Sequence, residues 1–308
     1  MMLAYTSTEL TSIFTMQGFA GLSLFSVLLL MALGLAIIFG QMGVINMAHG
    51  EFLTIGAYIT YLLSKWTTEF APALQPYYFF AAIVLSFMVA YAVGNLTERI
   101  LISKLYKRPL DTLLATWGLS LVMQQAFRSV FGAKEVSATL PDWLMGSFKP
   151  SDTIDIPING VFMMGLTVLL TGAIFVLLFR SRWGLQVRAT MQNRVMSGAV
   201  GINTRQVDRT TFSLGCGVAG VAGAAFTTIG STGPTSGSLY IVDTFLVVVF
   251  GGAQSLVGTI ASAFSIAQTQ STTEFFLTGS MAKVITLSAV ILILMLRPQG
   301  LFAAKLRK

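Results

Sequence analysis

The chain has 308 residues, of which 55% are hydrophobic and only 10% are charged. A soluble domain carries about 25% charged residues, so this composition excludes an ordinary soluble protein and predicts several membrane spans. The net charge of +7 does not indicate a nucleic-acid partner, because the basic residues gather in segments between apolar stretches.

A polar break interrupts the first apolar region of the chain. Apolar residues run before and after it, and Asn46, His49 and Glu51 stand between them. Polar groups at membrane depth are costly and usually line a path or pair with another group, so we place these three residues on a substrate path. The alternatives stay open: Asn46 caps the second helix, His49 is an internal hydrogen-bonding group, or Glu51 is favoured there by the helix dipole.

Stretches of about 20 apolar residues predict the spanning helices. These lie at 20–42, 44–64, 77–101, 111–131, 158–179, 209–230 and 281–297. The region 240–278 is longer and is interrupted at Gly251-Gly252. We expect a re-entrant half-helix at 240–251 and then a helix over about 254–276. The fold class is an all-α polytopic membrane protein of about eight helices, with residues 1–308 in a single transmembrane domain.

Basic residues indicate the orientation of these spans. Most of the 19 Lys and Arg residues fall in the segments 97–111 and 180–209 and in the tail from Arg297. Because basic loops stay on the cytoplasmic side, these segments are predicted to be cytoplasmic. The N-terminus and the loop 132–157 then lie outside, and the C-terminus lies inside.

The second half of the chain contains a similar interruption. The glycine-rich segment 230–237 holds Thr232, Thr235 and Ser236, and Asp243 follows it. Interrupted hydrophobic segments in corresponding positions of two halves point to the binding site of a transporter. We therefore expect two pseudo-symmetric halves and add these four residues to the substrate path. The alternative is that both interruptions are ordinary loops.

The segment 180–208 is too polar to span the membrane. Four apolar residues in it, Val187, Met191, Val195 and Ala199, lie four positions apart. This spacing predicts one short amphipathic helix with a single apolar stripe. Gly184 can begin this helix and Gly201 can end it. Such a helix docks into a groove on a cytoplasmic partner or lies on anionic lipid, and the residues leave both open.

Several blocks of the sequence resemble permease subunits of ABC importers of the branched-chain amino acid type. They are 43–51 with Gly56-Ala57-Tyr58, 199–202 at the end of the family's ATPase-contacting loop, and 297–302 as its C-terminal signature. Two further stretches, 109–118 and 240–252, resemble the urea and short-chain amide subunit more than the leucine branch. The resemblance covers nearly the whole chain from Gly21.

This resemblance implies half of the translocation path of an ATP-driven importer for urea or short-chain amides, with branched-chain amino acids as the alternative. It implies a bacterial cytoplasmic membrane and four kinds of partner or surrounding: a second homologous permease subunit in a heterodimer, two cytoplasmic ATPase subunits, an extracytoplasmic substrate-binding protein and membrane lipid. It assigns the ATPase contact to Val187, Arg188, Met191, Asn193, Arg194, Val195 and Ala199.

The sequence lacks the phosphate-binding loop G-x-x-x-x-G-K-[ST]. We therefore expect ATP and magnesium to bind the ATPase partners, and this chain to hold no cofactor and to be no enzyme. An intramembrane enzyme or a metal site is disfavoured further because the only histidine and the only cysteine, His49 and Cys216, lie in different spans.

Two questions of mechanism stay open at this point. A stand-alone channel or ion-coupled carrier would need no ATPase and would give Glu51 or His49 a role in protonation, and the patterned segment 180–208 argues against it. Neither polar break contains Lys or Arg, which favours a neutral amide over an amino acid zwitterion. Backbone N–H groups at a helix end could still receive a carboxylate.

Overall fold

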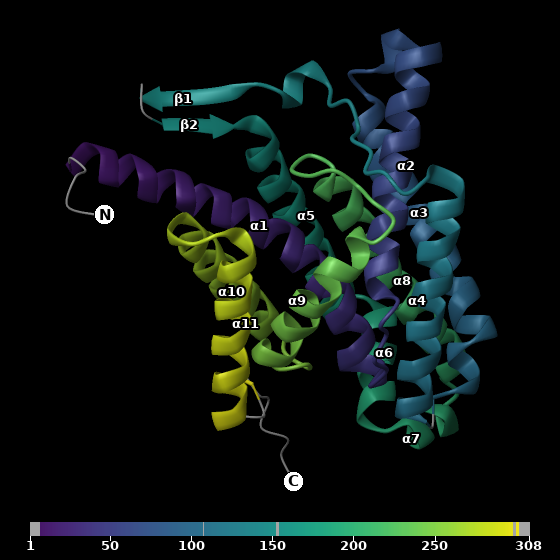
Figure 1. Ribbon diagram of the computed structural model, residues 1–308. Coiled ribbons are helices and arrows are strands. Elements are labelled where there is room, and N and C mark those ends of the chain that lie inside the picture. The colour runs from purple at the N-terminus through teal and green to yellow at the C-terminus, as the bar shows by residue number, and fades with distance from the viewer. Residues whose placement is uncertain (1–6, 107, 152–153, 298–299, 302–308) are drawn as a thin grey trace.

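The computed structural model describes residues 7–106, 108–151, 154–297 and 300–301, which form eleven α-helices and two short strands (Figure 1). The long helices are α1 (Ser7–Met42), α2 (His49–Phe70), α3 (Tyr78–Ile100), α4 (Pro109–Phe131), α5 (Ile158–Arg180), α8 (Thr204–Phe226), α9 (Ser236–Gly251), α10 (Leu256–Phe276) and α11 (Gly279–Leu296). The short ones are α6 (Arg182–Gln192) and α7 (Arg194–Ala199). The all-α, polytopic prediction is confirmed.

The predicted spans coincide with helices except near their ends. The second helix begins at His49 rather than at residue 44, because Gly43 adopts a left-handed φ of 64° that ends α1 and the chain then runs without helix to residue 46. Four stretches, in α1, from α3 to Lys104, in α5 and in α11, are long and apolar enough to cross a membrane on their own. The interior helix α8 instead carries many small and polar residues that are buried.

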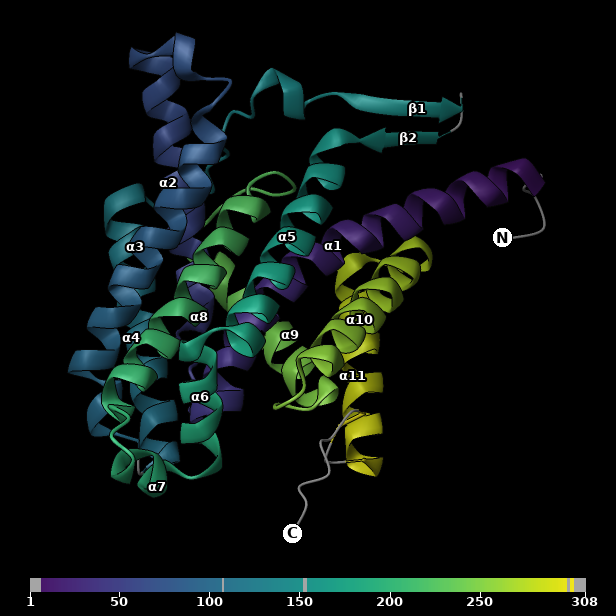
Figure 2. The ribbon, with the colours of Figure 1, turned by 180° about the vertical axis from the view of Figure 1, so that it is seen from behind.

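The packing relates two inverted halves of the chain. Helices α1, α2, α3 and α4 of the first half correspond to α8, α9, α10 and α11 of the second. Helix α1 packs on α10, and its counterpart α8 packs on α3. In the same way α2 packs on α8, and its counterpart α9 packs on α1. Likewise, α2 contacts α3 and α4, while α9 contacts α10 and α11. Exchanging α1–α4 with α8–α11 therefore preserves these neighbours. Since α1 and α8 run in opposite directions (Figures 1 and 2), the halves form the inverted repeat that is common in transporters.

Backbone contacts mark the axis of this repeat. A Cβ atom built on Gly34 of α1 would lie 2.5 Å from the carbonyl oxygen of Gly215 in α8, and one built on Gly215 would lie 2.5 Å from that of Gly34. Small residues allow membrane helices to approach this closely. The expectation of two pseudo-symmetric halves thus agrees with the observed packing.

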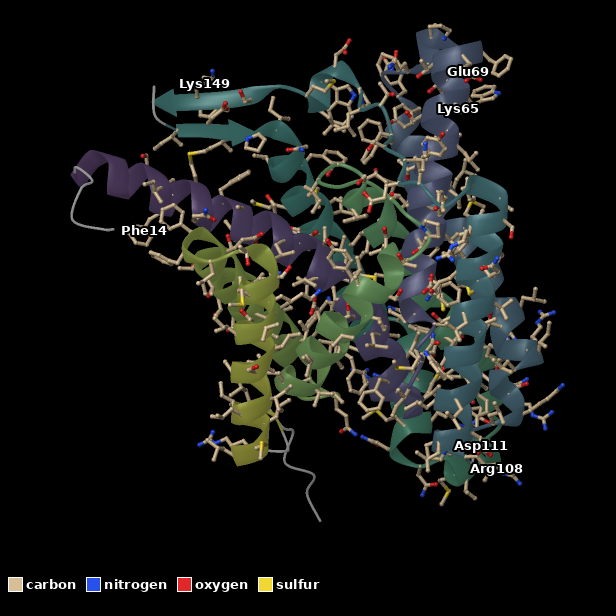
Figure 3. The ribbon with its side chains drawn as sticks, in the orientation of Figure 1. Phe14, Lys65, Glu69, Arg108, Asp111 and Lys149 are labelled. Atoms are coloured by element: carbon tan, nitrogen blue, oxygen red, sulfur yellow. The ribbon has the colours of Figure 1, made fainter. Side chains whose placement is uncertain are left out.

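The described residues of the basic segments 97–111 and 180–209 gather at one end of the molecule, and Lys305, Arg307 and Lys308 of the tail lie outside the described residues. In both ribbon views α6 and α7 lie at this end, while the hairpin of β1 (Ser147–Ser151) and β2 (Ile154–Pro157) lies at the other (Figures 1 and 2). Figure 3 places Arg108 beside α7, and Lys65 and Lys149 at the hairpin end. The sequence did not predict the hairpin, which belongs to the loop 132–157. That the α7 end is cytoplasmic stays a prediction from the distribution of basic residues.

The region expected to be re-entrant forms α9 and α10, joined by a turn in which Gly252 has a φ of 93°. The turn therefore falls where Gly251-Gly252 predicted it. Helix α9 has 16 residues, a length of about 24 Å, and the N–H of Leu301 donates to the carbonyl of Phe250 at its end (2.8 Å). A re-entrant position of α9 in the membrane stays a prediction.

Candidate functional site

The two predicted interruptions meet at the centre of the molecule. Gly50 in the first turn of α2 and Gly237 in the first turn of α9 touch through their backbones: a Cβ built on either one would lie 2.2 Å from the carbonyl oxygen of the other. The N–H of Gly237 also donates to Oγ1 of Thr54 (3.0 Å). The amino ends of two helices, one from each half, therefore cross here, as at the substrate sites of inverted-repeat transporters.

A buried carboxylate lies beside this crossing. Oε1 of Glu51 accepts from Ser120 Oγ (2.9 Å) and Gln124 Nε2 (2.9 Å), both on α4. Gln124 also reaches Ser238 Oγ on α9 (3.3 Å). Glu51 is buried, and among the described residues its other oxygen, Oε2, has no hydrogen-bond partner. We refer to Glu51, Ser120, Gln124 and Ser238 as the crossing cluster.

An unpaired carboxylate oxygen in a buried site is costly and calls for a partner. Among the described residues Oε2 of Glu51 is enclosed and lacks a partner, so a ligand would meet it only where the two helix ends move apart. The sequence pointed to Glu51 but missed Ser120, Gln124 and Ser238. The residues Ser120 and Gln124 lie four apart on one face of α4, and this spacing was the signal that could have shown them.

Asn46 and His49 are buried next to the same helix end, and each side chain makes a hydrogen bond with the backbone. Oδ1 of Asn46 accepts from the N–H of Ala48 (3.1 Å), and Ala48, not Asn46, occupies the N-cap position of α2, without a side-chain cap hydrogen bond. Nε2 of His49 lies 3.2 Å from the carbonyl oxygen of Met31 in α1. His49 therefore hydrogen-bonds to α1 on the far side from α4, and its place on a substrate path stays a prediction.

The side chains of Thr232, Thr235 and Ser236, before and at the start of α9, make no hydrogen bond with the crossing cluster within the described residues. Thr232 exchanges backbone hydrogen bonds with Val136 of the loop 132–157 (2.8 Å each). Ser236 Oγ accepts from the N–H of Gly233 (2.8 Å), and Thr235 is exposed. Thr235 contributes only its carbonyl, which accepts from Ser238 Oγ (2.9 Å). Their role on the path stays a prediction.

Asp243 forms an ion pair that the sequence did not reveal. Its Oδ2 lies 2.8 Å from Nζ of Lys283 on α11, and the same ammonium donates to the carbonyl of Leu239 (2.8 Å). Asp243 is buried, and its Oδ1 has no hydrogen-bond partner in the part of the chain that the structure describes. The ion pair joins α9 to α11, and the crossing cluster joins α2 to α4. The two halves therefore carry corresponding polar contacts between helices.

The segment 180–208 forms two helices where one was predicted. Asn193 has an extended backbone (φ −153°, ψ 98°) that separates α6 from α7, and its Oδ1 accepts from the N–H of Met196 to cap α7 (3.0 Å). The single stripe is therefore wrong: Val187 is buried, whereas Val195 is 85% exposed. Gly201, with a φ of 89°, follows the end of α7 as expected.

The exposed apolar side chains of this segment differ from the predicted stripe. They are Leu185, Val195, Met196 and Val200. Met191 is half-buried, Ala199 is exposed, and Arg188 lies over the ring of Phe179 (5.1 Å). Of the predicted ATPase-contacting residues, Val195 and Ala199 present an apolar surface, while Val187 belongs to the core.

The side chain of Arg194 forms an ion pair and a cation–π contact within this chain. It pairs with Asp208 near the start of α8 and lies over the ring of Tyr106 (5.3 Å). The hydroxyl of Tyr106 donates to Glu98 (2.7 Å), and Glu98 pairs with Arg209 (3.2 Å). Burial and the neighbouring Glu98 carboxylate raise the pKa of Tyr106 far above its usual range, so its hydroxyl stays protonated. This network ties α7 to α3 and α8.

Known proteins match nearly the whole chain. Residues 18–296 match the family described as "Branched-chain amino acid transport system / permease component". The permease LivH of a high-affinity branched-chain amino acid system in Salmonella typhimurium is 26% identical, over 94% of this chain and 95% of LivH. The corresponding BraD of Pseudomonas aeruginosa is 27% identical (91% and 93%), and a probable LivH of Methanocaldococcus jannaschii is 24% identical (92% and 90%). No solved structure matches the chain.

Proposed function

Since the chain belongs to the family of branched-chain amino acid permease components, we propose that it forms half of the translocation path for a branched-chain amino acid in an ABC importer. The relatives named above are all branched-chain amino acid permeases. They support this substrate over urea or a short-chain amide, the substrate first expected from the sequence. The family is one of membrane permeases, and transport rather than catalysis is its activity.

The single observation that carries the proposal is the position of Glu51 Oε2 beside the crossed helix ends, where this buried carboxylate oxygen has no hydrogen-bond partner among the described residues. An amino acid has an ammonium group and a carboxylate, and the crossing offers a partner for each. Oε2 of Glu51 accepts from the ammonium group. The amino ends of α2 and α9 carry the positive ends of two helix dipoles, which favour the carboxylate.

A second candidate substrate, urea or a short-chain amide, has an observation in its favour. Within the described residues the crossing cluster contains no Lys or Arg, and its oxygens can accept from the N–H groups of a neutral amide. Urea has no anionic group, so it would gain little from the helix dipoles. The two substrates therefore make different demands on the same site.

The partners follow from the family. We infer a second permease subunit that completes the path, ATPase subunits that bind ATP and magnesium, and a substrate-binding protein outside. The contact with an ATPase is formed by exposed apolar side chains of α6, of α7 and of the residue after α7: Leu185, Val195, Met196 and Val200. Arg194 transmits movement of α7 to α8 through its pair with Asp208.

The substrate is tested by uptake in the native host, with and without this gene. Labelled leucine and labelled urea are each supplied at micromolar concentration, and each is challenged with an excess of the other. Energy-dependent leucine uptake that disappears in the deletion and resists excess urea supports the amino acid. Loss of urea uptake alone, blocked by acetamide and not by leucine, would replace it with the amide.

A further inference from the structure

We propose that a cavity between the cytoplasmic ends of α3 and α8 binds the phosphate group of an anionic phospholipid. The cavity has a volume of about 380 Å³. Three arginines and three amide side chains line it: Arg99, Arg205, Arg209, Asn95, Asn203 and Gln206. This site is separate from the crossing cluster, and the inference goes beyond transport of the substrate.

The charge of the cavity is only partly compensated. Arg209 pairs with the buried carboxylate of Glu98 (3.2 Å), which also accepts from the hydroxyl of Tyr106 (2.7 Å). Within the described residues, Arg99 and Arg205 have no ion pair. The cavity therefore keeps two uncompensated positive charges and one arginine fixed in position. Planar guanidinium groups suit the oxygens of a phosphate.

The face of α3 above the cavity is apolar. Phe87, Tyr91, Asn95 and Arg99 follow one another at intervals of four residues, so they share one face of the helix. The rings of Phe87 and Tyr91 stack at 6.0 Å between centroids. This face is aromatic at membrane depth and becomes amide and then basic toward the helix end, which matches the order of acyl chain and headgroup in a phospholipid.

Lipid can reach the cavity from the side. Leu96 and Ile100, next to Asn95 and Arg99 on α3, are 56% and 58% exposed, and α3 belongs to one of the stretches apolar enough to cross a membrane. Basic pockets between spanning helices on the cytoplasmic side attract anionic headgroups. An ATPase subunit is the competing occupant, because the cavity includes Asn203 beside the end of the α7 segment.

A second basic cavity at the same end supplies the matched control. It has a volume of about 640 Å³ and includes Lys104, Arg108 and Arg194. Arg108 pairs with Asp111 (3.5 Å), and Arg194 pairs with Asp208. Only Lys104 is then uncompensated. The variant Lys104→Gln/Arg108→Gln removes as many positive charges as Arg99→Gln/Arg205→Gln but leaves the proposed site intact.

The test is native mass spectrometry of the assembled importer with phosphatidylglycerol or phosphatidylcholine of the same acyl chains. We expect phosphatidylglycerol to be retained in preference. Each arginine near an anionic lipid contributes roughly fivefold in binding, so Arg99→Gln/Arg205→Gln should weaken it by roughly 25-fold. Lys104→Gln/Arg108→Gln should retain it as the wild type does. Equal retention by the wild type and Arg99→Gln/Arg205→Gln would overturn the proposal.

Two further arms separate the lipid from other occupants. Retention of phosphatidylglycerol in millimolar inorganic phosphate supports the lipid, whereas displacement by phosphate alone would assign the cavity to a free anion. The variant Arg205→Cys, with Cys216→Ala, is then treated with a thiol reagent in the assembled importer. Phosphatidylglycerol should slow this labelling, whereas protection that persists after the lipid is removed with detergent would place the cavity under an ATPase subunit and overturn the proposal.

Discussion

Replacing Gly50 by alanine should separate the two helix ends that cross at the centre of the molecule. The new Cβ would lie 2.2 Å from the carbonyl oxygen of Gly237, whereas real Cβ atoms essentially never approach a heavy atom within 3.0 Å. The helices must therefore move apart by about 0.8 Å. Because the opposing atoms belong to the backbone, the cost should be at the upper end of the usual 1–3 kcal/mol, about 3 kcal/mol.

Thermal unfolding of the purified protein in detergent measures this cost. For a chain of this size about 3 kcal/mol corresponds to a fall in Tm of roughly 5 °C. Gly165→Ala on α5 is the matched control, since a Cβ there would meet no heavy atom within 4 Å, and its Tm should be unchanged or slightly higher. A Gly50→Ala protein as stable as Gly165→Ala, with full transport, would refute the reasoning.

Three other changes test the remaining polar contacts. Glu51→Gln keeps the shape of the side chain but removes its charge, so leucine uptake should fall by at least about tenfold at unchanged protein level; full uptake would remove Glu51 from the path. Lys283→Met leaves Asp243 buried and unpaired and should cost about 2 kcal/mol of stability, which Asp243→Asn should restore in the double variant, read as Tm. Arg194→Asp should lower substrate-stimulated ATPase activity, and adding Asp208→Arg should recover it; no recovery would show that the pair does not transmit movement.

Much of the fold could be predicted because apolar length and glycine position decide it locally. The spans follow from runs of apolar residues, and the turn after α9 falls at Gly251-Gly252 because glycine adopts the positive φ observed there. The two interruptions were recognised from composition alone. Their meeting at Gly50 and Gly237 could not be predicted, because it depends on how two halves far apart in sequence pack together.

The contacts of the polar residues were the harder part. Asp243 and Lys283, which pair between two helices, lie about forty residues apart in the sequence. No local sequence pattern predicts this pair. The stripe from Val187 to Ala199 failed for another reason: Asn193 hydrogen-bonds the backbone of the next helix, and this local capping outweighs the four-residue periodicity.

The most direct test of the account is protection of the crossing cluster by substrate. Ser238→Cys, in a protein with Cys216→Ala, is treated with a small thiol reagent in the assembled importer, and Ser129→Cys on the exposed end of α4 serves as the control. We predict that leucine slows labelling at position 238 but not at position 129. Urea should leave the labelling rate unchanged at both positions. Labelling at position 238 that is unaffected by leucine, in an importer that still transports leucine, would contradict a substrate site at the crossing of α2 and α9.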